Sequence, residues 1–547
     1  MKRLFSFFRK SWLRFSLLEK VVFIFLIFSF VFGLIFLLKI SLNKFTIEVP
    51  QKGGNLKLGL ICRPSLINPV YVSNNDCDRD LIELIFDSLV TVDGKGGTAL
   101  RLADKIEISP DGKTYTVFLK DNLFWHDGAP FTSEDVVFTV ETIQNPKIKS
   151  PLRLNWEGIV AEAISKSAIR FNLRNSYEPF INHLSFKILP KHIWANIEPE
   201  NFALAEYNLK PVGIGPYLFE SLEKDKSGRI LSYSLLANHN YHLGSPKIDS
   251  LVFTFYDSYE DAKQAFLKKE IEGFSPIELE DSNFFQNKKA VRINKIILPG
   301  YYAIFYNLKN PIFTREVRNA LELAIDKNLL VNEVLKNQVI PLQSIFLPPY
   351  SSDQNPIEFS PEKAKEILNK AGYSQEKPLK FKLFVPNIPE AINVSNFLIS
   401  SWQKTGVEVE PVILETQELT REIIETRNYD ALFFGEIIGQ SADLYSFWHS
   451  SQIESPGLNL SLFKNKTLDQ LIEENRSTLN KDKKLENLKK IKEIFGQEKP
   501  ALFLYNTYYL YLLPNKIKGN SVKISNFASE RFADVYNWYI YIQRKLK

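Results

Sequence analysis

An uninterrupted apolar stretch near the N-terminus most constrains what this chain can become. Residues 21–38 read VVFIFLIFSFVFGLIFLL, without a charged residue or a proline. As an α-helix these eighteen residues span roughly 27 Å, close to the apolar thickness of a bilayer. Because a backbone in lipid must satisfy its hydrogen bonds within the segment, we predict a transmembrane helix over residues 21–40.

The residues before this stretch are strongly basic. Only Glu19 opposes Lys2, Arg3, Arg9, Lys10, Arg14 and Lys20. Positive flanks stay on the cytoplasmic side, so residues 1–20 are predicted to be cytoplasmic and the chain after Lys39 extracytoplasmic. A cleaved signal peptide is the alternative. The long apolar run and the lack of a small-residue cleavage site in LKISLNKFTIEVP argue against it.

The rest of the chain is electrically balanced. The formal net charge is +5, and the first twenty residues alone carry +5, so residues 21–547 hold 62 basic and 62 acidic side chains. Proteins that bind nucleic acid usually carry a basic surface. No nucleic-acid partner is therefore expected.

Cys62 and Cys77 are the only cysteines, and both lie in the predicted extracytoplasmic part. A disulfide between them would close a loop of about 15 residues, but the sequence leaves the pairing open. Two cysteines without clustered histidines do not predict a zinc site. The chain also lacks H-E-x-x-H and G-x-S-x-G motifs, so we expect no enzyme, no metal and no cofactor.

About 500 residues follow the predicted helix, which is more than one core usually covers. Apolar residues at helical spacing predict a helix over residues 80–89. Thr132 and Asp135 have the spacing of a capping box that opens another helix. Residues 314–330 and 360–373 also have helical patterns. Since strand patterns lie between these helices, we expect two or more α/β lobes.

Several segments occur in the order that is typical of one family. They are LIELIFDSLVTVDG, FWHDGAPFTSEDVVFTVE, PVGIGPYLFE, LLANHNYHLGSPKIDSLVFTFY, YYAIFYNLKNPIFTREVRNALELAIDK, SPEKAKEILNKAGY, NYDALFFG and DLYSFWHSSQ. Together they resemble the family 5 extracytoplasmic solute-binding proteins of ABC transporters, which handle oligopeptides, dipeptides and nickel. The resemblance covers nearly the whole predicted exterior.

The resemblance implies an α/β, two-lobed fold of the type II periplasmic-binding-protein class, with an extra inserted domain, preceded here by the transmembrane helix. We expect a stalk at 41–55 and an inserted domain at 79–205. The first lobe would take residues 46–78, 206–298 and 514–547, and the second lobe residues 299–513. Such lobes close around a ligand by hinge motion.

The resemblance also points to site residues. In peptide-binding relatives an aspartate near this chain's Phe447 pairs with the α-amino group of the peptide, and its position falls at about Gln440. Since glutamine is neutral, Glu436 or Asp443 would have to substitute. Asp443 aligns better with a structural aspartate of the family.

Further ligand-binding candidates are Asn68, Tyr302, Asn307 and Trp448, each with a packing role as the alternative. The resemblance implies a membrane-tethered receptor that hands a peptide or other small solute to ABC permease subunits. Two alternatives stay open. One is the same fold with an oligosaccharide or a chelated metal as ligand, and the other is a ligand-free sensor, chaperone or scaffold.

Overall fold

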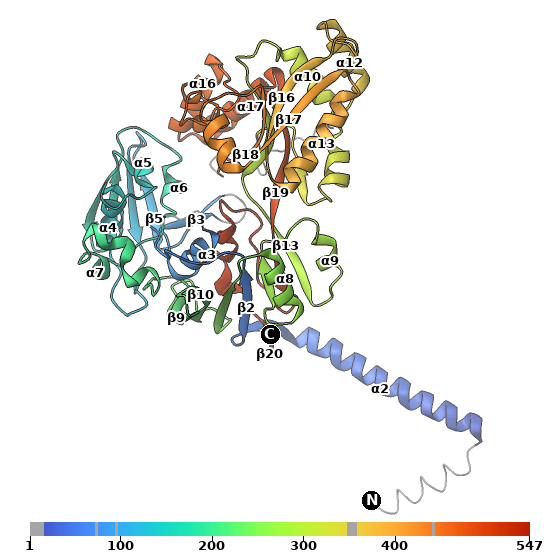
Figure 1. Cartoon of the computed structure of the whole chain (residues 1–547). Coiled ribbons are helices and arrows are strands. Elements are labelled where there is room, and N and C mark those ends of the chain that lie inside the picture. Colours follow the sequence, from blue (N-terminus) through green and yellow to red (C-terminus); the bar gives the residue numbers. More distant parts are fainter. Residues whose placement is uncertain (1–15, 72–74, 93–96, 347–357, 440–442, 547) are drawn as a thin grey trace, which may run out of the picture.

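The protein is described by a computed structural model that covers residues 16–71, 75–92, 97–346, 358–439 and 443–546. Figure 1 shows a body of three parts from which one long helix projects. We call these parts the first lobe, the inserted domain and the second lobe. Each part is built around its own sheet. This α/β arrangement agrees with the expected fold class.

The projecting helix is α2 (Leu17–Phe45), which extends the predicted transmembrane segment at both ends. Its first turn is capped reciprocally. The Ser16 amide donates to the Glu19 carboxylate over 2.8 Å, and the Glu19 amide donates to Ser16 Oγ over 3.3 Å. Leu17–Leu37 is long and apolar enough to cross a membrane and is not buried by the part of the chain that the structure describes, properties that a signal sequence shares.

The segment after α2 differs from the stalk predicted at 41–55. Residues 41–45 continue the helix, and β1 (Thr46–Gln51) pairs antiparallel with β20 (Tyr541–Leu546). The C-terminal strand therefore lies where α2 meets the body, as Figure 1 shows. The partner strand β20 is almost five hundred residues away in the sequence. No local pattern indicates such a pairing, so β1 was not predicted.

The first lobe is built on a five-stranded sheet of order β12-β2-β11-β10-β9. Its strands are β2 (Asn55–Leu60), β9 (Tyr217–Lys224), β10 (Ile230–Ala237), β11 (Ser250–Phe255) and β12 (Gly273–Ser275). β2 runs parallel to β11 and β12, and the other pairs are antiparallel. The helical segments of this lobe are α8 (Tyr259–Leu267), α9 (Ser282–Gln286), η6 (Ala528–Phe532) and η7 (Val535–Asn537).

The inserted domain carries a four-stranded antiparallel sheet of order β5-β6-β8-β7. Its strands are β3 (Val90–Val92), β4 (Thr98–Leu100), β5 (Ala103–Ile108), β6 (Thr114–Leu119), β7 (Val160–Ser165) and β8 (Ala168–Asn172), of which β3 and β4 form a separate pair. Its helices are α4 (Ser133–Gln144), α5 (Arg153–Trp156), α6 (Phe180–His183), α7 (Lys191–Trp194), η1 (Pro199–Leu204) and η2 (Glu206–Asn208). The predicted capping box of Thr132 and Asp135 opens α4.

Helix α3 (Asp76–Ile85) joins the first lobe to the inserted domain and starts earlier than the predicted helix at 80–89. It ends at Ile85 because the carbonyl oxygen of Ile85 accepts a hydrogen bond from the Gly215 amide over 2.8 Å. A Cβ atom at Gly213 would lie 1.9 Å from the same oxygen, so only glycine permits this approach. The boundary predicted between 78 and 79 thus falls inside α3, and one hydrophobic core runs across it.

The second lobe is built on the sheet β13-β19-β14-β18-β16-β17, with β15 beside β19. Its own strands are β14 (Gly300–Tyr306), β15 (Val339–Pro341), β16 (Leu379–Pro386), β17 (Val407–Leu414) and β18 (Ala431–Ile437). Its helices are α10 (Arg315–Leu323), α11 (Lys327–Leu329), η3 (Leu330–Val334), α12 (Pro361–Lys370), α13 (Pro389–Gln403), α14 (Thr416–Glu418), η4 (Leu419–Ile424), α15 (Tyr445–Trp448), η5 (Ser450–Gln452), α16 (Lys466–Ser477) and α17 (Lys481–Glu498). Two separate clusters of buried residues form its core.

Two strands connect the lobes. The first half of β19 (Ala501–Pro514) pairs with β14 and β15, and its second half pairs with β13 (Val291–Ile297). Figure 1 shows both strands running from the second lobe into the first. Leu510 and Leu512 pack against Phe274 of the first lobe, so residues 508–513 lie there and not in the second lobe as predicted. The run ALFLYNTYYLYLLP contains no break that would reveal this change of surroundings.

Candidate ligand-binding site

A cavity of about 280 Å³ lies between the first lobe and the inserted domain. Its walls come from the segment after β2, from α3, from the α5 and α6 regions and from η6. The lining residues are Pro69, Arg79, Ile82, Glu83, Leu152, Asn155, Trp156, Asn182, His183, Ser185, Phe186, Lys187, Phe527, Ser529 and Glu530. A mostly apolar hollow with a few charged groups is the usual form of a solute site.

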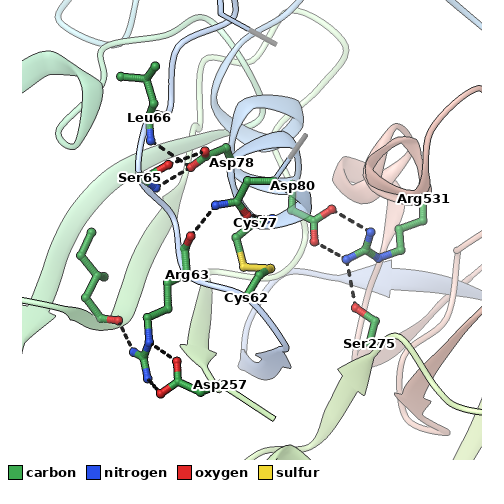
Figure 2. Close-up of a disulfide and its surroundings, with 12 residues drawn as sticks. Cys62, Arg63, Ser65, Leu66, Cys77, Asp78, Asp80, Asp257, Ser275 and Arg531 are labelled. Atoms are coloured by element: carbon green, nitrogen blue, oxygen red, sulfur yellow. Dashed lines mark hydrogen bonds and ion pairs between the residues drawn. A yellow bond between two sulfur atoms is a disulfide. The ribbon is translucent and has the colours of Figure 1, made fainter. Parts of the chain in front are cut away.

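Helix α3, which contributes Arg79, Ile82 and Glu83 to the cavity lining, also carries the buried carboxylates Asp78 and Asp80. Asp78 accepts hydrogen bonds from the Ser65 and Leu66 amides over 2.7 and 3.1 Å. Asp80 forms a two-bond ion pair with Arg531, whose guanidinium also donates to Ser275 Oγ over 3.2 Å. Both partners of that pair are 2 % exposed. Figure 2 shows how Asp78 and Asp80 connect α3 to these segments.

A disulfide joins Cys62, after β2, to Cys77 in the first turn of α3, with the two Cα atoms 5.9 Å apart. The pairing that the sequence left open is therefore present. Figure 2 places it beside Asp80, on the side of α3 that faces the segment after β2. It fixes the start of α3, and with it the orientation of the helix that lines the cavity.

The charged groups of the cavity make different kinds of contact. Lys187 pairs with Glu83 over 2.8 Å, and their side chains are 11 % and 6 % exposed. The carboxylate of Glu530 accepts a hydrogen bond from the Asn526 amide over 2.7 Å. Burial raises the pKa of Glu530 to about 7, and the nearby charge of Glu83 acts in the same direction. The Arg79 guanidinium lies 4.8 Å from the centre of the Phe527 ring.

His183 connects the cavity to a contact between the inserted domain and the second lobe. Its ring packs edge-on against Tyr177, with centroids 5.5 Å apart. Burial lowers the pKa of His183, so the imidazole is neutral at pH 7. Tyr177 in turn contacts two residues of the second lobe, since its hydroxyl donates to Asp443 and its ring lies under the Arg476 guanidinium.

We call Tyr177, Asp443, Tyr445 and Arg476 the interlobe cluster. Arg476 pairs with Asp443 over 3.1 Å, and the Tyr177 hydroxyl donates to Asp443 over 3.1 Å. The guanidinium lies 4.3 Å from the Tyr445 ring centre and 5.0 Å from that of Tyr177. Asp443, a candidate ligand anchor by sequence, is therefore engaged with Arg476 and Tyr177.

The interlobe contact continues beside this cluster. The Glu178 amide donates to the Arg476 carbonyl over 2.8 Å, and its carboxylate forms an ion pair with Lys484. Ser176 Oγ donates to the Ser477 carbonyl over 3.0 Å. Residues 176–178 of the inserted domain thus lie against α16 and α17 of the second lobe.

Glu436 and Trp448 were ligand-binding candidates by sequence, and the structure places both in the core of the second lobe. The Tyr301 hydroxyl donates to Glu436 and accepts from Trp448 Nε1 over 3.0 Å. Trp448 is 0 % exposed and Glu436 6 %. Burial raises the pKa of Glu436 to about 8, so this carboxyl is mainly protonated at pH 7.

The remaining candidates make structural contacts. Asn68 is fully buried, donates to Asn208 Oδ1 over 2.9 Å and is followed by Pro69 of the cavity wall. Asn307 donates to the Tyr429 carbonyl over 2.8 Å. Tyr302 is half-buried and stacks on a tyrosine of β19, with centroids 5.2 Å apart. Gln440 lies outside the described residues.

Residues 98–455 match the sequence model of a known family, the bacterial extracellular solute-binding proteins, family 5. This chain belongs to that family. Its members bind solutes and are not enzymes.

Two curated members of family 5 are similar over most of their length. The oligopeptide-binding protein AppA of Bacillus subtilis (strain 168) is 28 % identical over 504 residues, which cover 86 % of this chain and 89 % of AppA. The dipeptide-binding protein of Escherichia coli (strain K12) is 26 % identical over 452 residues, which cover 76 % of this chain and 82 % of that protein.

Solved structures of the family have the same fold. The substrate-binding protein CtaP of Listeria monocytogenes matches with a TM-score of 0.78 and 26 % identity, over 90 % of this chain and 100 % of CtaP. Bacillus subtilis AppA, solved in complex with a nonapeptide, matches with a TM-score of 0.68 and 25 % identity, over 90 % of this chain and 100 % of AppA.

The sequence did not predict the charged residues of the cavity. They are Arg79, Glu83, His183, Lys187 and Glu530. Acidic residues on a helix usually lie in solvent, and no local motif marked these as buried. Only the apolar neighbours of Glu83 in DLIELIF hinted that α3 is covered on several sides.

In the described part of the chain, no group of three or more His, Cys, Asp or Glu side chains is arranged to hold a metal ion. The ring N–H of His242 donates to the buried Asp87 carboxylate over 2.9 Å. That contact gives the histidine a structural partner. The chemistry that the cavity offers is reversible binding by hydrogen bonds, charge and apolar contact.

Proposed function

We propose that this chain is a membrane-tethered receptor that binds peptides and delivers them to the permease of an ABC importer. The observation that carries the proposal is the similarity to oligopeptide-binding AppA over 86 % of the chain, together with the fold of AppA in its nonapeptide complex. The dipeptide-binding relative of Escherichia coli points to the same class of ligand.

The geometry supports a receptor that encloses its ligand. The cavity lies between two parts of the body, and the ring of His183 packs against Tyr177 of the interlobe cluster. In the structure the second lobe already contacts residues 176–178, which precede the cavity residues 182–187 in the sequence, so release and re-formation of this contact would admit and enclose a solute. Charged and polar groups that are already held in place, such as those on α3, lower the cost of binding.

The proposed tether is α2. Its apolar residues from Leu17 to Leu37 are not buried by the described body, and six basic residues precede or begin the helix. This arrangement favours an N-terminus in the cytoplasm and a body outside the membrane. Because α2 continues directly into β1, the body would stand close to the membrane, where a permease lies.

Native mass spectrometry of residues 46–547 tests the ligand class, since this fragment keeps the whole body and lacks only the projecting helix. We expect a bound series of masses that is released on denaturation and fragments as peptides. A bound oligosaccharide or metal complex would contradict the peptide proposal. A protein that carries no ligand and binds no component of a tryptic casein digest by calorimetry would contradict the receptor itself.

A further inference from the structure

We infer that Glu530 receives a cationic group of the bound ligand inside the cavity, with Glu83 as a second negative charge beside it. The chemistry is that of a primary ammonium or a guanidinium. Two parts of a peptide carry such a group, the α-ammonium and the side chain of lysine or arginine. This inference rests on the proposed function and adds the ligand chemistry that the cavity selects.

Glu530 is held in place by its surroundings. It lies in η6, directly before Arg531, and the buried pair of Arg531 with Asp80 fixes η6 against α3. Backbone amides of the same turn orient the carboxylate, as the Asn526 contact of 2.7 Å shows. The residue lines the cavity and keeps part of its surface exposed there. A ligand group in the cavity can therefore reach it.

The cations near Glu530 have other partners. Lys187 pairs with Glu83, and Arg79 lies over the ring of Phe527. Within the residues that the structure describes, no lysine or arginine forms an ion pair with Glu530. A carboxylate deep in a protein without a cation is costly, and a cation from the ligand would remove that cost.

The cavity walls suit the rest of such a ligand. Trp156 and Phe186 pack edge to face with ring centroids 4.6 Å apart, and Phe527 adds a third, partly exposed ring. Aromatic walls accept the aliphatic stem of a lysine or arginine and attract a cation to their faces. With a volume of about 280 Å³, the cavity takes an amino-acid side chain or a short peptide end.

Binding of a cation at Glu530 has a proton signature. The pKa of Glu530 is about 7, so part of the carboxyl population holds a proton near neutral pH and must release it to pair with the cation. The other groups that face it are Glu83 and Arg79 from α3, and Lys187 and neutral His183 from the inserted domain. Affinity for a cation should therefore rise between pH 6 and pH 8.

The first experiment is calorimetry on the full chain in lipid nanodiscs, with wild type, Glu530→Gln and the control Glu366→Gln. Glu366 is an exposed helix residue paired with Lys370 and lies on α12 of the second lobe. The probes are Ala-Ala-Ala, N-acetyl-Ala-Lys-Ala and N-acetyl-Ala-Ala-Ala, which carry the cation on the N-terminus, on the side chain or nowhere. We expect wild type and Glu366→Gln to prefer one cationic probe by about tenfold and to release protons on binding.

Glu530→Gln should lose both the preference and the proton release while it still binds the probe that lacks a cation. A Glu530→Gln protein that keeps both would overturn the inference. Which cationic probe is preferred distinguishes an α-ammonium from a side-chain cation.

A second measurement separates this inference from the proposed function. The thermal stability of the same three proteins is followed with butylammonium, and with butanol as the uncharged match. Stabilisation of wild type but not of Glu530→Gln by the amine supports the inference even where no peptide binds, in which case the peptide function alone fails. Equal melting temperatures with amine and alcohol in wild type, together with no preference among the peptides, would overturn the inference.

Discussion

Two glutamates of this protein show how surroundings decide the role of a carboxyl group. Glu436 lies in the core of the second lobe, where Tyr301 donates to one oxygen and the other has no partner among the described residues. Glu530 lies at a cavity wall that a ligand can reach. Burial raises the pKa of both groups. The first therefore acts as a neutral core residue, and the second is available for a cation.

The neutral state of Glu436 predicts how stability depends on pH. Between pH 4.5 and pH 8 the folded protein keeps a proton on Glu436 that the unfolded chain has lost, because the folded pKa is about 8 and the ordinary value 4.5. The free energy of unfolding therefore falls as pH rises through this window, by up to about 1.4 kcal/mol per pH unit from this group.

Urea unfolding of wild type and Glu436→Gln at pH 5, 6.5 and 8 measures this effect. Since glutamine does not titrate, the stability of wild type relative to the variant should decline as pH rises. A difference that stays constant over the three pH values would mean that Glu436 is ionised in the fold.

At the residue scale, the described ligand-binding candidates that the sequence offered in the second lobe do not line the cavity. Asp443 does lie at the contact between the lobes, but it is paired with Arg476. Glu83, Lys187 and Glu530 come from three distant parts of the chain, and only the folded chain brings them to one cavity. A local sequence motif does not show which distant residues the fold brings together, so these cavity residues could not be predicted.

At the scale of elements, the helix starts were the best predicted features because caps are local. Ser360 caps α12 and Pro361 occupies its first turn, so this helix starts where the pattern over 360–373 predicts it. The helix predicted over 314–330 is interrupted, since the side chain of Asp326 accepts from the Leu329 amide and starts a new turn. The pairing of β1 with β20 is non-local and was missed.

The disulfide gives a prediction at this scale. Replacing both Cys62 and Cys77 with serine opens a loop of sequence separation 15. In the chain-entropy account such a loop contributes about 3 kcal/mol, so the free energy of unfolding should fall by about that amount. The urea midpoint of the double variant measures it, with reduced wild type as the matched comparison.

If the disulfide also orients α3, the double variant should bind peptides more weakly than wild type. The loss of affinity should exceed the loss expected from the unfolded share of the protein alone. Equal urea midpoints for oxidised wild type and the double variant would contradict the stabilising role.

At the scale of the whole molecule, two strands and one interlobe contact define how the parts move. β13 and β19 connect the lobes on one side. The interlobe cluster and the ion pair of Glu178 with Lys484 hold the second lobe against the inserted domain on another. These contacts are polar and partly exposed, so we expect them to open more readily than the apolar cores of the lobes.

The resemblance to family 5 predicted this architecture from the order of its motifs, and the family match and the fold agree with it. The exact division between the lobes could not be predicted, because β19 passes from one lobe to the other within one continuous apolar run.

The central claim is that this receptor binds its solute between α3, the inserted domain and η6, and closes the second lobe over it. Hydrogen–deuterium exchange of the full chain in nanodiscs, with and without a tryptic digest of casein, tests it most directly. We predict slower exchange in α3, in residues 182–187 and 526–531, and in the interlobe segments 176–178 and 474–478. Binding that protects other segments while these exchange unchanged would contradict the account.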